Sequence, residues 1–357
     1  MNVRRFVVSD AQIIREEVIK ERDKKDWDNK DWHRAIGIDQ RALEAVDVGT
    51  LDLSLPENAS LKSIILQATR DSELPDMPRF KQPVVIAFDI HKGGGGKTTM
   101  AVNIACELGQ RGYNVLLVDG DSQGDSTTTI LPNEDAGAMA QEDSYAKQIE
   151  RKNLFACMNS DYLDMDIRDH IICSDYDGLD IVPSNTNLSK MDVMLSAMEF
   201  REQIFSNALK GLMEENYYDF VLVDMDKNLG LFNTTILCGC DYIMIPCECE
   251  MYHLKGLYVM DVQIEKVKRY NERLKLLGVV FNKVDKRKRS VEEAKIAAGT
   301  KFGDVIFDSM LRVDSNIGNS QFAGMPVMIY SRSCRASQEL RGITDEMLDR
   351  IKKGRGM

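Results

Sequence analysis

The sequence predicts an α/β fold, a doubly wound and mostly parallel sheet preceded by a helical N-terminal extension. Short apolar runs typical of buried strands alternate with helical segments over residues 81–357. A run of glycines joins the first of these strands to a helix, and acidic residues follow two other strands. Residues 1–80 lack such strands, hold both tryptophans and are dense in alternating charge, so we expect a separate helical region there.

Composition excludes several classes of protein. A chain of 357 residues, 43% of them hydrophobic, can bury a substantial core. No stretch approaches the about 18–20 consecutive apolar residues of a membrane span, and polar sequence rather than a secretion signal follows the first residues. The net charge of −11 argues against a wholly basic nucleic-acid coat. Eight scattered cysteines indicate reduced thiols, so we expect a cytoplasmic protein.

Two helices and a linker are expected in residues 1–80. Ser9 is a suitable N-cap for a helix that runs to about Lys25. Its apolar stripe consists of Ile13, Ile14, Val18 and Ile19. This stripe either packs onto its own domain or forms a dimer contact, and the sequence favours neither. A second helix is expected over residues 59–70 and a linker over 74–78, and no convincing helix-turn-helix is visible.

The glycine run is the most informative motif in the chain. The segment Lys92–Thr99 reads KGGGGKTT and closely follows the apolar segment 84–88. Such a loop can wrap its N–H groups around phosphate oxygens, and a helix that begins near Thr98 points its positive end at the same anion. Lys97 can reach the β- and γ-phosphates, and the Thr98 hydroxyl can bind Mg²⁺. The candidate nucleotide ligands are Gly93, Gly94, Gly95, Gly96, Lys97, Thr98 and Thr99.

The remaining elements follow in order. The helix after the loop stops before Gly112 and residues 115–118 form the next strand, which completes a βαβ unit. This context disfavours the alternative that the glycines form a flexible linker. Residues 131–164 are expected to be irregular, and residues 198–215 are expected to form a helix. A strand that ends in a loop is expected over residues 179–185, and further strands are expected at residues 218–224, 242–246 and 277–282.

Carboxylates lie at or just beyond the ends of two predicted strands. Asp224 ends an apolar strand, where it can hold Mg²⁺ through water. Asp121 lies in the loop beyond the strand at 115–118 and is better placed than Asp119 to orient an attacking water. The candidate metal residues are Thr98, Asp119 and Asp224, and the candidate catalytic residues are Lys97 and Asp121. Helix capping by Asp224 and turn formation by Asp121 are the alternatives.

The segment Asn282–Asp285 reads NKVD and ends another predicted strand. It is similar to the base-reading motif of GTPases, but it is short, and ordinary turn chemistry is the alternative. We treat Asn282 as a candidate nucleotide ligand. The cations that follow are Lys286, Arg287, Lys288 and Arg289. They can pair with DNA phosphates without reading bases, and a solvated basic loop is the alternative.

Taken together, these motifs resemble the ParA family of DNA-partition ATPases. The matching segments are 92–99, 118–124, 181–185, 218–224, 229–231, 245–250 and 324–327. The resemblance implies a P-loop NTPase fold with a deviant Walker A motif, in which a homodimer closes around two molecules of ATP with Mg²⁺. In this family the first lysine of the loop, here Lys92, reaches the partner's nucleotide, so Lys92 is a third candidate catalytic residue.

The resemblance also implies partners. The ATP-bound dimer would bind DNA non-specifically, and a ParB-type adaptor would stimulate hydrolysis, which places the protein on the nucleoid and not at a membrane. Residues 1–80 resemble the extension of larger plasmid-type members, which use it for dimerisation and operator binding. Ser122 and the pair Asp226-Lys227 stand where the family usually has prolines, so the local geometry there is open.

Three alternative functions remain open. A MinD-like membrane-positioning ATPase would end in a membrane-binding helix, whereas we expect the C-terminal apolar stripe to face the core. This stripe consists of Ile343, Met347, Leu348 and Ile351. A nucleotide-switched repressor would use residues 1–80 to bind an operator. A GTPase of the same superfamily would use the aspartate of the NKVD segment to read guanine.

Overall fold

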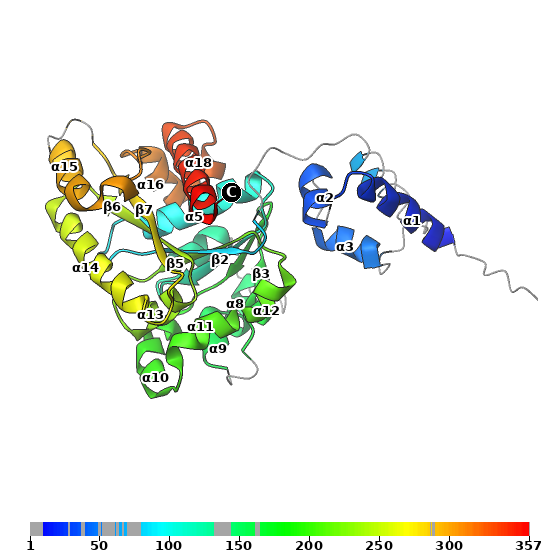
Figure 1. Ribbon diagram of the computed structural model, residues 1–357, viewed down its shortest axis with the longest axis horizontal. Coiled ribbons are helices and arrows are strands. Elements are labelled where there is room, and N and C mark those ends of the chain that lie inside the picture. The colour runs from blue at the N-terminus through cyan, green and yellow to red at the C-terminus, as the bar shows by residue number, and fades with distance from the viewer. Residues whose placement is uncertain are drawn as a thin grey trace, which may run out of the picture. The chain divides into compact units, whose positions relative to one another are not determined.

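The computed structural model divides the chain into two compact units, Met1–Arg79 and Phe80–Met357 (Figure 1). The described residues are 10–27, 29–36, 40–48, 51, 61, 64–65, 68–69, 80–131, 144–160, 165–285, 287 and 290–356. Ser9, the linker at 74–78 and most of the helix expected at 59–70 lie outside them. Each unit has its own buried core.

The larger unit is built on a seven-stranded sheet. Its strands are β1 (Val84–Phe88), β2 (Val115–Gly120), β3 (Ile172–Cys173), β4 (Leu179–Val182), β5 (Phe220–Met225), β6 (Tyr242–Glu248) and β7 (Lys275–Asn282). The order is β3-β4-β2-β5-β1-β6-β7, and neighbouring strands are parallel except for β3 with β4. The predicted fold class is confirmed, and β3 is a short edge strand that the sequence did not predict.

Helices cover both faces of the sheet, because its central strands are apolar on both sides (Figure 1). Helices α5, α17 and α18 lie on one face, and α9, α11, α13 and α14 lie on the other. The α-helices are α5 (Lys97–Gln110), α6 (Asp125–Ile130), α8 (Tyr145–Arg151), α9 (Leu154–Met158), α10 (Met191–Ala197), α11 (Ile204–Ala208), α12 (Lys210–Glu215), α13 (Leu231–Cys238), α14 (Met251–Val267), α15 (Ser290–Phe302), α16 (Ser315–Phe322), α17 (Val327–Tyr330) and α18 (Arg335–Arg355). The 3₁₀ helices are η2 (Ile167–His170), η3 (Thr186–Lys190), η4 (Arg201–Gln203) and η5 (Gly303–Val305).

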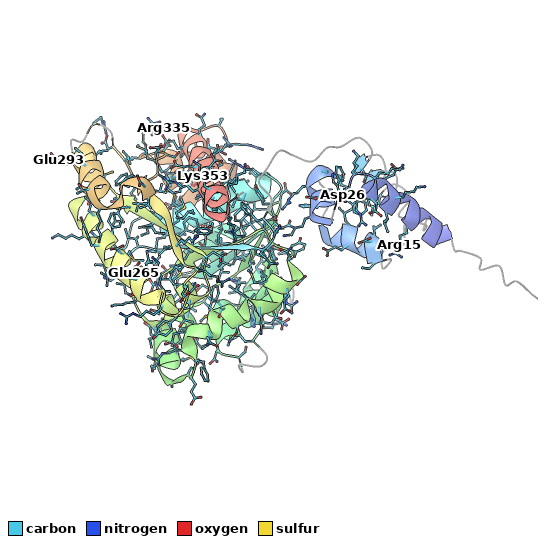
Figure 2. All side chains as sticks on the ribbon, viewed as in Figure 1. Arg15, Asp26, Glu265, Glu293, Arg335 and Lys353 are labelled. Carbon is cyan, nitrogen blue, oxygen red and sulfur yellow. The ribbon has the colours of Figure 1, made fainter. Side chains whose placement is uncertain are left out.

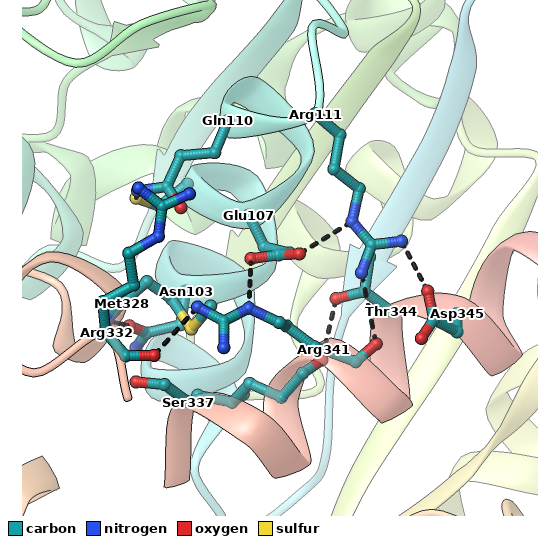
Figure 3. Close-up of polar contacts among 12 residues, drawn as sticks. Asn103, Glu107, Gln110, Arg111, Met328, Arg332, Ser337, Arg341, Thr344 and Asp345 are labelled. Atoms are coloured by element: carbon teal, nitrogen blue, oxygen red, sulfur yellow. Dashed lines mark hydrogen bonds and ion pairs between the residues drawn. The ribbon is translucent and has the colours of Figure 1, made fainter. Parts of the chain in front are cut away.

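The helix that follows the glycine loop, α5, is anchored at its C-terminal end to α18 (Figure 3). Glu107 is buried and pairs with Nε of Arg111 at 2.7 Å and with Nε of Arg341 at 3.5 Å. Arg111 also pairs with Asp345 of α18 at 2.5 Å. Because the glycine loop precedes the other end of α5, this network holds the helix of the phosphate loop in place.

The apolar stripe of α18 faces the core, as predicted. Its residues Ile343, Met347, Leu348 and Ile351 are each at most 5% exposed. Charged residues of the same helix, such as Arg335 and Lys353, are exposed instead (Figure 2). Within the described parts of the chain, no helix is both long and apolar enough to span a bilayer.

Two predictions of local structure are wrong. The described part of residues 131–164 contains two helices, α8 and α9, because Ser144 and Asn153 cap them by accepting bonds from backbone N–H groups. Residues 198–215 do not form one helix. Phe200 has a φ of 51°, in the left-handed region, and the segment after it divides into η4, α11 and α12.

The smaller unit contains α1 (Asp10–Asp23), α2 (Asn29–Ile36) and α3 (Gln40–Val48). Its core consists of Val18, Trp27, Trp32, Leu43, Val46 and Ile65. The indole N–H of Trp32 donates to Oγ1 of Thr69 at 2.6 Å, which satisfies its only polar atom. Val18 of the predicted apolar stripe is fully buried in this core, so this part of the stripe packs within its own unit. The short helices α2 and α3 had no prediction from the sequence.

Candidate phosphate-binding site

The glycine loop joins the C-terminal end of β1 to α5. Gly94 and Gly96 have φ values of +82° and +92°, a region that residues with a Cβ rarely adopt. A Cβ at Gly96 would also collide with the side-chain amide of Asn282. Both the backbone conformation and the lack of space therefore require glycine at this position. Gly96 is the N-cap of α5, which begins at Lys97, one residue before the expected start.

A cavity of about 360 Å³ opens over this loop. The predicted residues in its lining are Gly93, Gly94, Gly96, Lys97, Thr98, Thr99, Asp121 and Asn282. The residues in its lining that had no site prediction are Asp125, Lys227, Lys283, Ile317 and Gln321. Its size is typical of a small-molecule site, and a buried lysine at the N-terminus of a helix suits a polyphosphate.

Asp224 lies in β5 directly beside the last residue of β1, below the glycine loop. It is fully buried, and its Oδ2 accepts from Oγ of Ser126 at 2.8 Å. Its Oδ1 has no hydrogen-bond partner among the described residues. Burial raises the pKa of Asp224, and the nearby hydroxyls of Thr98 and Ser126 oppose this rise. An orphaned carboxylate oxygen close to the Thr98 hydroxyl fits the oxygen-rich surroundings that Mg²⁺ requires.

Asp119 lies opposite Asp224 in the β2–β5 pair and is also fully buried. Its Oδ2 accepts from N and Oγ1 of Thr127 at 2.8 and 2.6 Å, and its Oδ1 accepts from N of Asp121 at 3.1 Å. Burial and then the charge of Asp224 raise the pKa of Asp119. These bonds fix the start of α6 and the loop before it. Asp119 is not among the cavity-lining residues, and its role at the metal stays a prediction.

Asp121 lies in the loop after β2 and lines the cavity, where the sequence placed it. Its Oδ1 accepts from N of Gln123 at 2.9 Å, which shapes the turn. Burial raises the pKa of Asp121, and the charge of Lys97 lowers it. The structure thus brings Asp121 and Lys97 to one cavity. The part that Asp121 plays in orienting water stays a prediction.

The NKVD segment contacts the glycine loop. Nδ2 of Asn282 donates to O of Gly95 at 2.9 Å, and Nζ of Lys283 donates to O of Gly94 at 2.7 Å. Asn282 is 2% exposed, so its amide is committed to the loop. This contact was not foreseen, because the sequence pattern suggested a residue that touches the nucleotide itself.

Among the remaining candidate residues that the structure describes, Arg287 does not line the cavity. The guanidinium of Arg287 is exposed and pairs with Asp285 at 2.8 Å. Lys286, Lys288 and Arg289 lie outside the described residues. The side chain of Lys92 is not part of the cavity lining. The roles of these residues toward DNA and toward a second subunit stay predictions.

Two further charged residues lie near the cavity. Lys227 follows β5, lines the cavity, and has its carbonyl oxygen 3.2 Å from Nδ1 of His91. The sequence signal for Lys227 was a charged residue where the family usually has proline. Asp89 directly follows β1, and neither of its buried oxygens has a hydrogen-bond partner among the described residues. Burial raises the pKa of Asp89 to about 7, and no sequence pattern pointed to it.

Comparison with known proteins agrees with this geometry. The family model AAA_31, described as an AAA domain, matches residues 84–276. The chromosome partitioning protein ParA of Caulobacter vibrioides is 27% identical over 267 residues, which is 74% of this chain and 94% of that protein.

Two solved structures share the fold. A plasmid partition protein of Borrelia burgdorferi matches with a TM-score of 0.59 and 21% identity, over 76% of this chain and 100% of that chain. A cobyrinic acid a,c-diamide synthase of Mycobacterium smegmatis, solved with a bound ATP analogue and magnesium, matches with a TM-score of 0.62 and 22% identity, over 77% of this chain and 98% of that chain. The family model covers more than half of the sequence, and the chain belongs to the ParA family of P-loop ATPases.

Proposed function

We propose that this protein is an ATP-dependent DNA-partition protein, which hydrolyses ATP to ADP and phosphate with Mg²⁺. The observation that carries the proposal is the cavity over the glycine loop, where Lys97, Thr98 and Asp121 converge above the buried Asp224. The partition proteins among its relatives support the cellular role.

Binding follows from the chemistry of the loop and of α5. The N–H groups of the loop and the N-terminus of α5 attract the phosphates, and the buried ammonium of Lys97 adds a full positive charge. Thr98, Asp224 and, more remotely, Asp119 are the residues that would hold Mg²⁺. This ion, when bound, would neutralise charge on the phosphates.

Hydrolysis requires a water molecule in line with the terminal phosphate. Asp121 lies at the cavity and can orient such a water through its carboxylate. Lys92 does not line the cavity of its own chain, and we assign it to the cavity of a second subunit in a sandwich homodimer. A lysine supplied by the partner would stabilise the transition-state charge.

The ATP-bound dimer would then bind the DNA backbone without sequence preference. Arg287, with Lys286, Lys288 and Arg289, forms the proposed DNA contact. A ParB-type adaptor would trigger hydrolysis and so release the dimer from a nucleoid in the cytoplasm. Turnover without the adaptor is expected to be slow, because the attacking water is not fully positioned. Fast steady-state phosphate release in the absence of adaptor and DNA would contradict this mechanism.

The first test is binding to a random-sequence duplex with ATP, with ADP and without nucleotide. The proposal predicts binding that needs ATP, weakens steeply with salt and is lost in Lys92→Ala. Lys268→Ala is a matched control, because Lys268 pairs with Glu265 on α14, away from the cavity lining. Binding to one particular site without nucleotide would overturn the partition mechanism and favour a repressor.

One structural observation favours the alternative function, a nucleotide-switched repressor. Helix α2 ends at Ile36 and α3 begins at Gln40, a spacing used in helix-turn-helix motifs, and the sequence between them contains a glycine. Glu44 and Asp47 make α3 acidic, which is unfavourable for an approach to phosphates. Operator binding that disappears when residues 1–79 are deleted would support this second function, and unchanged binding would exclude it.

A further inference from the structure

We infer that Lys283, together with Asn282 and Glu248, positions the glycine loop for phosphate binding. This inference rests on the proposed nucleotide-binding function and assigns to the NKVD segment a role other than base recognition. These residues would act through the loop and not through the reacting atoms.

The contacts form a continuous chain from two strand ends to the loop. Nζ of Lys283 lies 2.8 Å from Oε1 of Glu248, at the end of β6, and 2.7 Å from O of Gly94. Nδ2 of Asn282, the last residue of β7, lies 2.9 Å from O of Gly95. Asn282 in turn accepts from N of Lys283 at 2.8 Å through its Oδ1. Two successive loop carbonyls are therefore held by two successive residues.

The geometry of the peptide bond explains how these two contacts would turn N–H groups of the loop toward an anion. In a trans peptide the C=O of one residue and the N–H of the next point in opposite directions. With O of Gly94 and O of Gly95 held toward the β7 side, N–H of Gly95 and N–H of Gly96 must point away from it. These N–H groups are then available to an anion, and carbonyl oxygens, which would repel phosphate, are turned away.

The conformation and charge of Lys283 agree with a positioning role. Its φ is 49°, a left-handed value that is uncommon for a residue with a long side chain. Such backbone strain persists only where surrounding contacts over-determine it. The ammonium is also paired with Glu248, whose side chain is 17% exposed, so its charge is largely compensated before any phosphate arrives.

A direct phosphate contact by Lys283 is the competing role, because the residue also lines the cavity. The two roles differ in their consequences. A positioning residue affects ADP and ATP alike, since the glycine loop cradles the phosphates that the two share. If Lys283 positions the loop, removal of Glu248 should weaken its contact with the loop and so weaken nucleotide binding. If Lys283 binds phosphate directly, removal of Glu248 should free its ammonium and strengthen nucleotide binding.

The test is calorimetric titration of the full chain with ADP and with a non-hydrolysable ATP analogue. Lys283→Met keeps the length of the side chain and removes the donor, and we expect it to weaken both nucleotides about tenfold. Glu248→Ala should weaken both about threefold, and Lys283→Arg, which restores a cationic donor, should recover most of the affinity. Lys301→Met is the control, because Lys301 is likewise paired, with Asp261 at 2.6 Å, but outside the cavity lining.

Unchanged nucleotide affinity in Lys283→Met would overturn the inference while leaving the proposed function intact. A loss confined to the ATP analogue, with tighter binding by Glu248→Ala, would overturn it in favour of a direct phosphate contact. A wild-type protein that binds neither nucleotide would overturn the proposed function itself. Thermal unfolding of each variant separates these results from a failure to fold, and Lys283→Arg supplies a second, conservative comparison.

Discussion

On the β5 side of the glycine loop lie three fully buried carboxylates, Asp89, Asp119 and Asp224, whereas on the β7 side Asn282 and Lys283 have their polar groups bonded to the loop. Burial raises the pKa of each of these carboxylates. Asp89 and Asp224 also retain oxygens without partners among the described residues. The β7 side of the loop is thus satisfied in hydrogen bonds, whereas the β5 side keeps unsatisfied oxygens on Asp89 and Asp224.

The β5 side is therefore the side of the loop where function costs stability. A buried carboxylate without full hydrogen bonding is costly, and a fold tolerates it where a ligand or ion compensates it. The satisfied β7 side holds the loop in one shape, so the unsatisfied β5 side can meet its ligand without rearranging it. Substitutions on the β5 side should therefore reduce activity and raise stability together, and substitutions on the β7 side should not raise stability.

The largest effect is expected for Lys97→Ala, because Lys97 directly follows the glycine loop and lines the cavity. Loss of a buried ammonium that faces polyphosphate should weaken ATP binding by about a thousandfold, or about 4 kcal/mol. The measurement is a nucleotide titration, with Lys301→Ala as the control for loss of one lysine. ATP affinity within tenfold of the wild type would show that the cavity is not the nucleotide site.

The next effect is expected for Asp224→Asn. Removal of this charge should lower the rate of ATP hydrolysis about a hundredfold and leave ADP binding nearly unchanged. The same substitution should raise the melting temperature of the nucleotide-free protein, since it removes a buried charge. Single-turnover hydrolysis and thermal unfolding measure the two effects. A variant that is both inactive and less stable would break the proposed difference between the two sides.

A smaller effect is expected for Lys227→Ala. Lys227 lines the cavity on the β5 side, and we expect its ammonium to favour the additional phosphate of ATP. The preference for an ATP analogue over ADP should therefore fall about tenfold, while ADP affinity stays the same. Equal losses for both nucleotides would place Lys227 with the positioning residues of the β7 side. Lys227→Arg is the matched control and should keep most of the preference.

The smallest effect on nucleotide binding and hydrolysis is expected for Asp89, whose substitution changes how stability depends on pH. Its pKa is about 7 in the folded protein and near 3.8 when unfolded, so between these values the folded state binds the extra proton. Folding stability from this group is therefore greatest in acid, falls as pH rises from about 4 to 7, and is constant above. Asp89→Asn should be equal to the wild type at pH 4 and more stable than it at pH 8, by up to about 4 kcal/mol for a pKa difference of this size. Denaturant unfolding at both values measures this, and a gap that does not change with pH would contradict it.

Much of the sheet and of the phosphate loop follows from local sequence. Every strand of four or more residues contains a short apolar run that is visible in the sequence. A KGGGGKTT segment between a strand and a helix is seldom anything but a phosphate-binding loop. The errors have local causes too: Asn153 caps a short helix inside a polar segment, and Phe200 adopts a left-handed conformation before a segment that reads as one helix. Neither feature changes the pattern of apolar residues, which is the main sequence signal for secondary structure.

The fold class, the glycine loop and the strand-end aspartates could be predicted from the sequence, because periodicity and a contiguous motif are short-range properties. The contacts of Asn282 and Lys283 with the glycine loop, in contrast, appear only in the folded structure. The two residues meet Gly95 and Gly94 across 187 and 189 residues of chain, since the strand order places β1, β6 and β7 side by side. The folded structure also leaves Asp89 buried without a hydrogen-bond partner among the described residues, because burial depends on elements that pack from elsewhere in the chain. Contacts of this kind carry no local pattern, and they follow from the packing of the whole sheet.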